Sequence, residues 1–381
     1  MGSIRQRSLT DGTIRYRAEI RINRKDYPAF IESKTFNSRR IAEKWIEDRE
    51  KAIKLNPDIL NGHSDLININ LGNAIKKYLE EVKDVYSVSK INTLKQIQKF
   101  PIAKVSISNL RSVDISNHVN LRKNGSVRIH LTTVAPSTIQ NELMQIRSVL
   151  THAMIMWDMP ININEFDKVT AQLRKTRQIA SSKKRDRLPT NEELSTLLQF
   201  FYNKWLNQKY TRYPMHLIIL FAIFSCRRES EITRLQLTDY NKDLSTWLVR
   251  NLKNPKGSAG NHKEFEIFDP VKKIINMFMR PEVRVRMLKC GFSDELLIPL
   301  RAQTIASEFT NACKILGIEN LTFHDFRHEG CTRLAEAGLT IPQIQRVSLH
   351  DSWQTLQRYV SVKKRVEPLE FSELLAIIDE G

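Results

Sequence analysis

The apolar stretch "MHLIILFAIFSC", residues 215–226, limits most strongly how this chain can fold. A membrane-spanning helix needs about 20 consecutive apolar residues, and this stretch is shorter. It therefore predicts a helix buried in the core of the C-terminal part of the chain. The N-terminal residues "MGSIRQRSLTDG" are polar and lack the pattern of a secretory signal peptide. We expect no membrane partner for this chain.

Residues 1–58 predict a small sheet backed by one helix. The stretch "TIRYRAEIRI" alternates as a half-buried strand does, a second strand is expected near 27–34, and "NSRRIAEKWIEDREKAIKL" predicts a helix. The expected core face of the first strand has Ile14, Tyr16, Ala18, Ile20 and Ile22, its open face has Arg15, Arg17 and Arg21, and the helix turns Ile41, Trp45 and Ile46 inward. An arginine face on a sheet suits the major groove of DNA. A solvated face with ordinary charges is an equally good interpretation.

The rest of the chain predicts mostly helices. A capping box, Thr190 with Glu193, begins a helix, and "TWLVRNLKNPKGSAGNHKEFEIF" predicts a hairpin. The expected segments are a helical bundle (66–173), a basic linker (174–189), a mostly helical domain with one small sheet (190–366) and an amphipathic tail helix (367–381). The fold class that we expect is multidomain and mainly α with small β-sheets.

The charge of the chain indicates the class of its partner. Sixty Lys and Arg residues against 42 Asp and Glu residues give a net charge of +18. Such a charge favours a polyanion, most often nucleic acid; the charge by itself does not exclude an anionic membrane surface, but the short apolar stretch disfavours a membrane. The four cysteines are scattered without C-x-x-C spacing, so we expect neither a disulfide framework nor a cysteine zinc site. A reducing cytoplasm fits this cysteine usage best.

The stretch "LTFHDFRHEG", residues 321–330, gathers groups that can do chemistry. In a helix, His324, Arg327 and His328 share one face. The H-x-x-x-H spacing is that of a zinc helix, with Asp325 at the position of the base, but the charge of Arg327 beside a cation disfavours this interpretation. The alternative is an anion site, in which Arg327 and His324 hold a phosphate. Taken alone, the stretch is also compatible with an accidental surface cluster.

Other parts of the chain supply partners for this stretch. Arg228 and Glu231 stand three residues apart in "CRRESEI", on one face of an expected helix. Lys253 lies in the predicted hairpin, and His350 precedes Tyr359 by nine residues. In this order and at these spacings the residues resemble the catalytic set of the tyrosine recombinases, the phage integrase family. The resemblance covers residues 186–365.

The chain departs from the family's pattern at two glycines. Cys226 stands two residues before the first arginine, and Leu349 stands immediately before the second histidine. The first departure raises the question whether Arg227 or Arg228 is the catalytic arginine. The position of Glu231, three residues after Arg228, favours Arg228.

The resemblance implies cleavage of DNA through a covalent 3′-phosphotyrosine, without a metal or another cofactor. A phosphodiester resists attack, so positive charge must surround its nonbridging oxygens in the transition state. Arg228 and Arg327 would supply that charge, and Tyr359 would attack the phosphorus. Glu231 would orient the neighbouring helix. His328 is expected to pack or cap rather than to react.

The remaining roles also come from the resemblance. Lys253 would protonate the 5′-oxygen leaving group, although Lys256 and Lys263 share its hairpin. His324 would assist proton transfer at the tyrosine, and His350 would donate a hydrogen bond to the phosphate.

The resemblance also implies partners and domain roles. Residues 1–58 resemble the arm-binding domain of lambda-type integrases, residues 66–173 resemble a core-binding domain that closes a clamp around DNA, and residues 190–366 would be catalytic. The expected partners are double-stranded DNA, three further copies of the chain in a tetramer, onto which the tail would dock, and a directionality factor or DNA-bending protein.

The expected activity is integration and excision of a mobile element. A shufflon-type invertase with the same chemistry is the main alternative. A DNA-binding regulator without catalysis and a type IB topoisomerase represent other functional classes.

Overall fold

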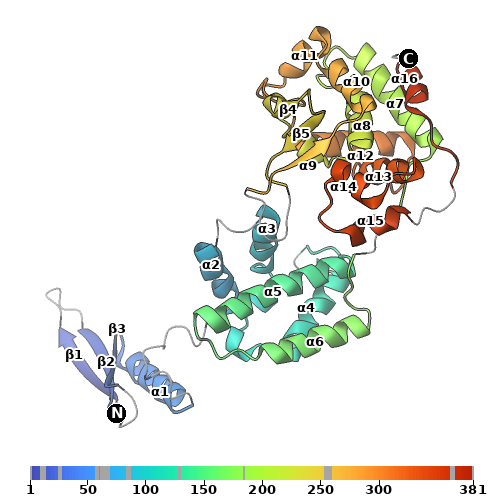
Figure 1. Ribbon diagram of the computed structural model, residues 1–381. Helices are drawn as coiled ribbons and strands as arrows, with labels where there is room; N and C mark the ends of the chain where they lie inside the picture. Colours follow the sequence, from blue (N-terminus) through green and yellow to red (C-terminus); the bar gives the residue numbers. More distant parts are fainter. Residues whose placement is uncertain are drawn as a thin grey trace. The chain divides into compact units, whose positions relative to one another are not determined.

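The computed structural model describes residues 2–8, 14–24, 28–55, 60, 69–82, 87–127, 130–182, 185–252, 260–360 and 365–379. The chain divides into an N-terminal unit, residues 1–183, and a C-terminal unit, residues 184–381. Figure 1 labels the helices and strands. In the described part of the chain no helix is long and apolar enough to cross a membrane.

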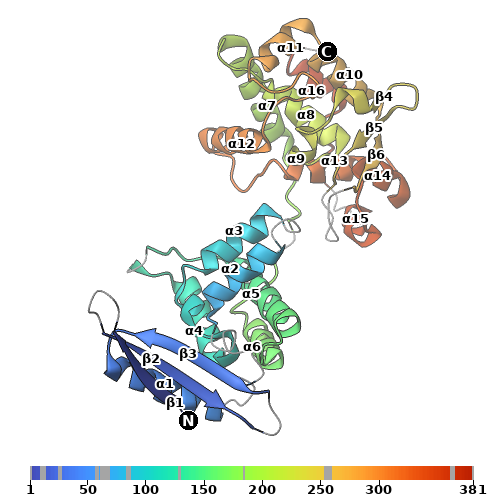
Figure 2. The ribbon, with the colours of Figure 1, turned by 90° about the vertical axis from the view of Figure 1, so that its left-hand side faces the viewer.

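An antiparallel sheet and one helix begin the N-terminal unit. The strands β1 (Gly2–Ser8), β2 (Ile14–Ile22) and β3 (Phe30–Phe36) pair in sequence order. Helix α1 (Arg39–Leu55) packs against all three strands and covers one face of the sheet (Figure 2). The alternation of β2 carries this packing, because Ala18 and Ile20 are fully buried on the side of α1.

Two expectations for this region are corrected. Strand β1 was not expected from the sequence, and it supplies an edge partner to β2. Ile41 was expected to face the sheet, but it is 56% exposed, whereas Ala42 and Ile53 are buried. The inner face of α1 therefore starts one residue later than expected, because the side chain of Ile41 points about 100° away from that of Ala42 on a helix.

A helical bundle with its own core completes the N-terminal unit, as the sequence predicts. Its helices are α2 (Leu71–Val82), α3 (Val88–Ile97), α4 (Ser112–Asn124), α5 (Pro136–Met156) and α6 (Ile163–Lys175), with 3₁₀ turns at Pro101–Lys104 and Ile107–Asn109. Helix α5 buries Ile139, Leu143, Ile146 and Leu150, which recur at helical spacing. This periodicity places α5 at the centre of the bundle.

The C-terminal unit is mostly helical, with one small sheet. Its helices are α7 (Asn191–Asn207), α8 (Met215–Ser225), α9 (Glu229–Ile232), α10 (Asp269–Phe278), α11 (Pro281–Leu288), α12 (Ala302–Leu316), α13 (Asp325–Glu336), α14 (Ile341–Ser348), α15 (Trp353–Val360) and α16 (Phe371–Ala376). The strands β4 (Tyr240–Asn241), β5 (Thr246–Val249) and β6 (Lys263–Glu266) pair antiparallel in that order.

Helix α8 is the buried helix that the apolar run predicts. It packs against α7, α10 and α13 (Figure 1). Such a helix, apolar on every side, needs neighbours all around it, and these helices provide them. The expected capping box also forms, because the backbone N–H of Thr190 donates to Glu193 Oε2 at 2.9 Å.

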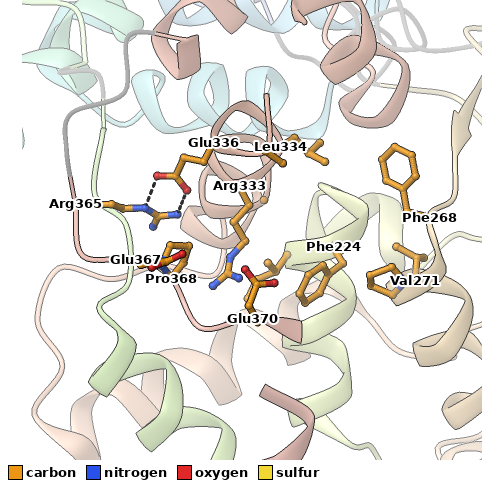
Figure 3. A pocket seen from close by; sticks show the side chains of 14 residues that line it. Phe224, Phe268, Val271, Arg333, Leu334, Glu336, Arg365, Glu367, Pro368 and Glu370 are labelled. Carbon is orange, nitrogen blue, oxygen red and sulfur yellow. Dashed lines mark hydrogen bonds and ion pairs between the residues drawn. The ribbon is translucent and has the colours of Figure 1, made fainter. Parts of the chain in front are cut away.

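The tail helix packs on its own unit. Leu374, Leu375 and Ile378 belong to the core around α8, and the ring of Phe371 lies 4.9 Å from that of Phe224, edge to face. A groove of about 520 Å³ lies between α13 and the segment that leads to α16, and Arg365 pairs with Glu336 at its edge (Figure 3). The apolar face of α16 packs on the core of its own unit, and docking of the tail on a neighbouring protomer stays a prediction.

Candidate active site

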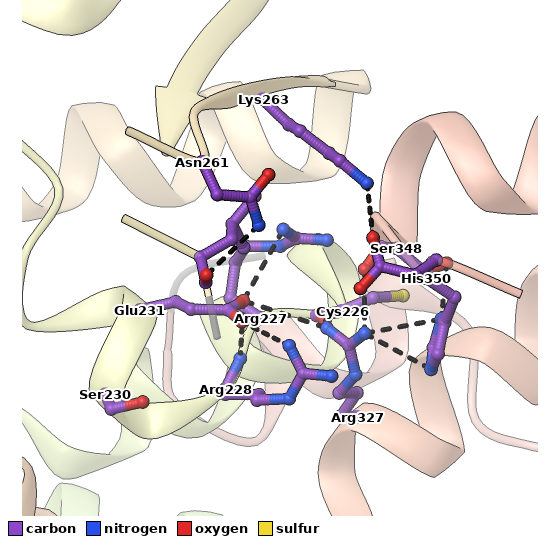
Figure 4. A network of polar contacts seen from close by, with 12 residues as sticks. Cys226, Arg227, Arg228, Ser230, Glu231, Asn261, Lys263, Arg327, Ser348 and His350 are labelled. Carbon is purple, nitrogen blue, oxygen red and sulfur yellow. Dashed lines mark hydrogen bonds and ion pairs between the residues drawn. The ribbon is translucent and has the colours of Figure 1, made fainter. Parts of the chain in front are cut away.

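Four short stretches of the C-terminal unit supply the predicted site residues that the structure describes. Arg228 lies between α8 and α9, Arg327 lies on α13, His350 follows α14 and Tyr359 lies on α15. Three of these helices pack together, since α13 contacts both α14 and α15. Figure 4 shows the polar network that joins the start of α9 to α13 and His350.

Glu231 is the carboxylate at the centre of this network. Its oxygens lie 2.5 Å from Nη1 of Arg228, 3.5 Å from Nη1 of Arg227 and 3.7 Å from Nη1 of Arg327 (Figure 4). Burial alone would raise the pKa of the Glu231 carboxyl, but the charges of the three arginines outweigh burial and hold the pKa below its usual range. The site therefore keeps an ionised carboxylate among three guanidinium groups.

Arg228 reaches Glu231 through a helix cap. It was expected on one helical face with Glu231, but its backbone is extended, and it is the N-cap of α9. The side chain of Glu231 reaches back to the backbone N–H of Arg228 at 3.2 Å and also accepts from its guanidinium. This double contact fixes Arg228 at the start of the helix while its side chain remains 30% exposed.

Arg227 differs from its neighbour in burial. Its guanidinium lies 4.6 Å over the ring of Phe265 and donates to the backbone carbonyls of Ser225 and Val347. Burial lowers the pKa of Arg227 to about 10. The structure thus leaves the side chain of Arg228 partly exposed and encloses Arg227 in the protein.

Arg327 joins α13 by hydrogen bonds to the loops that follow α8 and α14. It donates to the carbonyl of Cys226 at 2.5 Å and to that of Ser348 at 2.8 Å, and its Nη2 lies 3.2 Å from Nε2 of His350 (Figure 4). The side chain is buried. Its position is therefore set by the two loops that end α8 and α14.

Both loops use a left-handed residue at the position where the family usually has glycine. Cys226 has φ 55° and Leu349 has φ 54°, and each ends its helix as the C-cap. This conformation costs a residue with a Cβ about 1–2 kcal/mol. The two departures from the glycine pattern therefore preserve the backbone path and add strain next to Arg327 and His350.

His350 is held in its neutral form. It is buried, and its Nδ1 lies 2.8 Å from the hydroxyl of Ser348. Burial, together with the charge of Arg327, lowers the pKa of His350 to about 2. A neutral imidazole keeps one N–H donor for an anion.

Tyr359 and His328 form a contact that the sequence did not predict. The hydroxyl of Tyr359 lies 2.6 Å from Nδ1 of His328, although His328 was expected only to pack or cap. Burial raises the pKa of Tyr359, and burial with the neighbouring His324 lowers the pKa of His328 to about 4. Both groups are therefore neutral at neutral pH. The predicted helical face placed His328 with His324 and Arg327, but the sequence did not indicate Tyr359 as its partner.

His324 lies immediately before α13, as its N-cap residue. Its ring stands edge-on to that of His328 at 5.1 Å, and burial, with the charge of Arg327, lowers its pKa. The next residue, Asp325, is buried and pairs with Arg185 at 2.8 Å. Arg185 comes from the segment expected to be a basic linker, so part of that segment holds the first turn of α13 in place.

The predicted leaving-group acid is not placed by the structure. Lys253 and Lys256 lie outside the described residues. Lys263, the third lysine of the hairpin, begins β6 and pairs with Asp351 at 2.5 Å (Figure 4). Its charge is thus already engaged by a carboxylate next to His350.

The three predicted arginines of the N-terminal segment lie on the open face of the small sheet. Arg17 donates to Ser33 at 3.0 Å and Arg21 pairs with Glu19 at 2.5 Å, while Arg15 bonds to Asn37. Strand β1 adds two arginines to the same face, since Arg5 is opposite Arg17 and Arg7 is opposite Arg15. The face is therefore more basic than expected, but it has Glu19 in its middle.

Metal ligands do not gather in the described ranges, where no group of three His, Cys, Asp or Glu side chains could hold an ion.

Comparison with known proteins gives the family of this site. The model of the phage integrase family matches residues 188–365. This segment is a phage integrase domain. The chain is therefore an enzyme, a site-specific recombinase of the tyrosine type. The integrase domain contains all of the predicted residues from Arg228 to Tyr359.

Individual relatives are more distant. The shufflon-specific DNA recombinase of Escherichia coli is 25% identical over 318 residues, covering 77% of this chain and 70% of that protein. Among solved structures, the Tn1549 transposon integrase bound to a circular intermediate DNA superposes with a TM-score of 0.58 at 16% identity, covering 78% of this chain and 96% of that chain. A lambda integrase dimer bound to a core site superposes with a TM-score of 0.56 at 17% identity, covering 95% of this chain and 97% of that chain. These two likenesses show a shared fold.

Proposed function

We propose that the chain cuts and rejoins DNA at specific sites through a covalent bond between Tyr359 and a 3′-phosphate. The observation that carries this proposal is the charge of the site. Three guanidinium groups lie within 4 Å of one carboxylate, Glu231. The ring of the buried Tyr359 lies 6.1 Å from that of His350, which Arg327 contacts. Such a surplus of positive charge stabilises the additional negative charge that forms on a phosphodiester under attack.

The described residues suit the steps of this reaction. Arg228 and Arg327 contact the nonbridging oxygens, and His350 donates its N–H to one of them. Tyr359 Oη attacks the phosphorus, and a lysine of the hairpin, Lys253 by resemblance, protonates the departing 5′-oxygen. Glu231 holds the arginines in position. The covalent intermediate conserves the bond energy, so religation needs neither ATP nor a metal.

The domains suggest integration and excision of a mobile element. We assign arm-site binding to residues 1–58, core-site binding to 66–173 and catalysis to 190–366, with the tail of 367–381 beyond. The arginine face of the small sheet supports arm binding. The lambda integrase tetramer bound to a Holliday junction, whose fold the chain shares with a TM-score of 0.54, supports assembly of four copies on DNA. DNA-bending or directionality proteins would then be additional partners, and we assign the protein to the cytoplasm, which fits its scattered cysteines.

A shufflon-type invertase is the second candidate. The similarity to the shufflon-specific recombinase, which extends over most of both chains, favours it. The two candidates share all chemical steps and differ in the arrangement of the sites. Recombination of one plasmid with inverted sites and of two plasmids with single sites distinguishes them.

A nicked suicide substrate tests the chemistry. The wild-type chain should form a DNA-linked band on a denaturing gel, also in the presence of EDTA, whereas Tyr359→Phe should bind the site and form no band. A covalent band with Tyr359→Phe, or a need for a divalent ion, would contradict the proposed mechanism.

A further inference from the structure

The contact between His328 and Tyr359 has no role in the proposed mechanism. His328 lies on α13, one residue after Arg327, and Tyr359 lies on α15, which packs against α13. The 2.6 Å separation of Nδ1 and Oη is that of a good hydrogen bond. In the described part of the chain, His328 is the histidine within hydrogen-bond distance of the attacking oxygen.

The geometry points to His328 as the group that holds the Tyr359 hydroxyl in place and accepts its proton as the oxygen bonds to phosphorus. This inference rests on the proposed function, because it assigns a further residue to the same reaction. His324, whose ring lies 5.1 Å from that of His328, would then exchange the proton with His328 and not with the tyrosine directly.

The surroundings of Tyr359 fix the direction of its hydroxyl. The ring packs in an apolar cluster with Cys226, Cys331 and Leu356. The ring of His350, which contacts Arg327, lies 6.1 Å away. A ring held in this way keeps its oxygen near both His328 and the arginines, as an attack on a bound phosphate requires.

The protonation states of the pair define the donor and the acceptor. Burial raises the pKa of Tyr359, so the hydroxyl keeps its proton and must donate it to an acceptor. His328 is neutral at neutral pH and has one acceptor nitrogen. Nδ1 is therefore the acceptor, and Nε2 carries the hydrogen. In the free chain the proton stays on the tyrosine.

A bound phosphate changes this balance. Its negative charge beside His328 favours the imidazolium form and raises the pKa of the histidine. As the Oη–P bond forms, the O–H bond breaks and its proton passes to Nδ1. The P–O5′ bond breaks, and the 5′-oxygen takes a proton from the hairpin lysine. Religation reverses each transfer, so the residues return to their starting states.

Other charges also influence His328. The titratable and charged groups around it are His324, Asp325 and Arg327 on α13, Arg358 and Tyr359 on α15, and His350 beyond α14. We therefore assign an ionisation in the pH dependence of cleavage to His328 only if that ionisation disappears when His328 itself is substituted.

Two substitutions of His328 separate positioning from proton transfer. His328→Asn places an amide near the position of Nδ1, so the chain should fold and bind DNA, but an amide is a very weak base. His328→Ala removes both functions. We expect single-turnover formation of the covalent adduct to slow about 10²-fold or more in both variants, as is typical when a general base is removed. Imidazole in the buffer should restore part of the rate in His328→Ala.

A substrate with a 5′-bridging sulfur in place of the 5′-oxygen isolates the step. A thiolate leaves without protonation, so this substrate removes the need for the lysine acid. The defect of His328→Asn should persist on it, because the tyrosine proton must still move. The pH–rate profile of the wild-type chain should rise through one ionisation that the Asn variant lacks.

His216→Asn is the matched control. His216 is also buried, on α8, with its pKa lowered to about 3 by burial, but it packs against Tyr202 and Trp205. Its substitution should lower thermal stability and leave the shape of the pH–rate profile unchanged.

The outcomes separate this inference from the proposed function. If the wild-type chain forms no adduct, the proposed function is wrong. If the wild-type chain forms the adduct and His328→Asn forms it within about twofold of the same rate, the role of His328 is wrong. A defect that disappears on the sulfur substrate would assign His328 to the leaving group and also contradict the inference. If His328→Ala does not fold, His328→Asn decides.

Discussion

Arginines surround a carboxylate in two regions of this protein, with different consequences. In the integrase domain, Glu231 faces Arg227 and Arg327, whose side chains are at most 1% exposed. On the N-terminal sheet, Glu19 faces Arg17 and Arg21, whose side chains are 58% and 63% exposed. Charges in a low-dielectric interior interact strongly and are costly to leave unpaired, whereas water and salt screen exposed pairs. The first region is suited to stabilising a transition state, and the second to salt-dependent binding.

Removing the central carboxylate should give the largest difference between the two regions. Glu231→Gln leaves buried arginines without a counter-charge, so the free energy of unfolding should fall by about 3–5 kcal/mol. Glu19→Gln should change it far less. Urea unfolding of both variants measures the contrast, and an equal decrease in the two variants would contradict it.

Removing one arginine should separate rate from affinity. Arg228→Ala should slow adduct formation on the suicide substrate by about 10²-fold or more, because the interaction of this arginine with the phosphate strengthens in the transition state. Affinity for the core site should change little, since many other basic residues contact DNA. An equal decrease of rate and affinity would make Arg228 an ordinary ligand of the DNA backbone.

The arginines of the sheet should show the opposite behaviour. The triple variant Arg15→Ala, Arg17→Ala, Arg21→Ala should cleave an isolated core site at the wild-type rate. Its binding to arm-site DNA should weaken, and the slope of log K against log[salt] should become shallower by about 0.9 for each phosphate that the protein no longer neutralises. Footprints that do not change across the attachment region would favour the solvated-face interpretation and the invertase.

Acid should destabilise the integrase domain through its buried histidines. The pKa of His350 is lowered to about 2 in the folded domain, so its imidazole stays neutral there. In the unfolded chain the same imidazole gains a proton below pH ~6.5. Stability is therefore complete above that pH and falls as the pH decreases, by at most about 1.4 kcal/mol per pH unit for this group.

His350→Gln tests this contribution. Between pH 6.5 and 4.5 its melting temperature should fall less steeply than that of the wild-type chain. Residues 1–58 contain no histidine, so the sheet lacks this effect. Parallel curves for the two proteins would show that His350 does not contribute.

The smallest expected effect is backbone strain at Cys226. Cys226→Ala and Cys226→Gly both remove the thiol, and glycine normally destabilises relative to alanine. At φ 55° the order should reverse, with the glycine variant more stable by about 1 kcal/mol. In the described part of residues 1–58 no residue with a Cβ has a positive φ, so the sheet offers no equivalent. Thermal unfolding of the two variants measures the difference.

The sequence by itself determined the local structure and the chemical composition of the site. Alternation along β2, the apolar run of α8 and the capping box at Thr190 each depend on neighbouring residues, so periodicity was sufficient to predict them. The order and spacing of Arg228, Arg327 and Tyr359 resemble the catalytic set of the tyrosine recombinases, and that resemblance implied phosphoryl transfer.

Only the tertiary structure decided which groups touch. Arg227 and Arg228 are adjacent in sequence, but one is buried against Phe265 and the other reaches the surface. His328 meets Tyr359 because α13 packs on α15, and their 31-residue separation in sequence gives no sign of it. The tail helix joins the core of its own unit for the same kind of reason. Contacts between distant segments depend on how whole elements pack, whereas periodicity reports only on the face that each element turns inward.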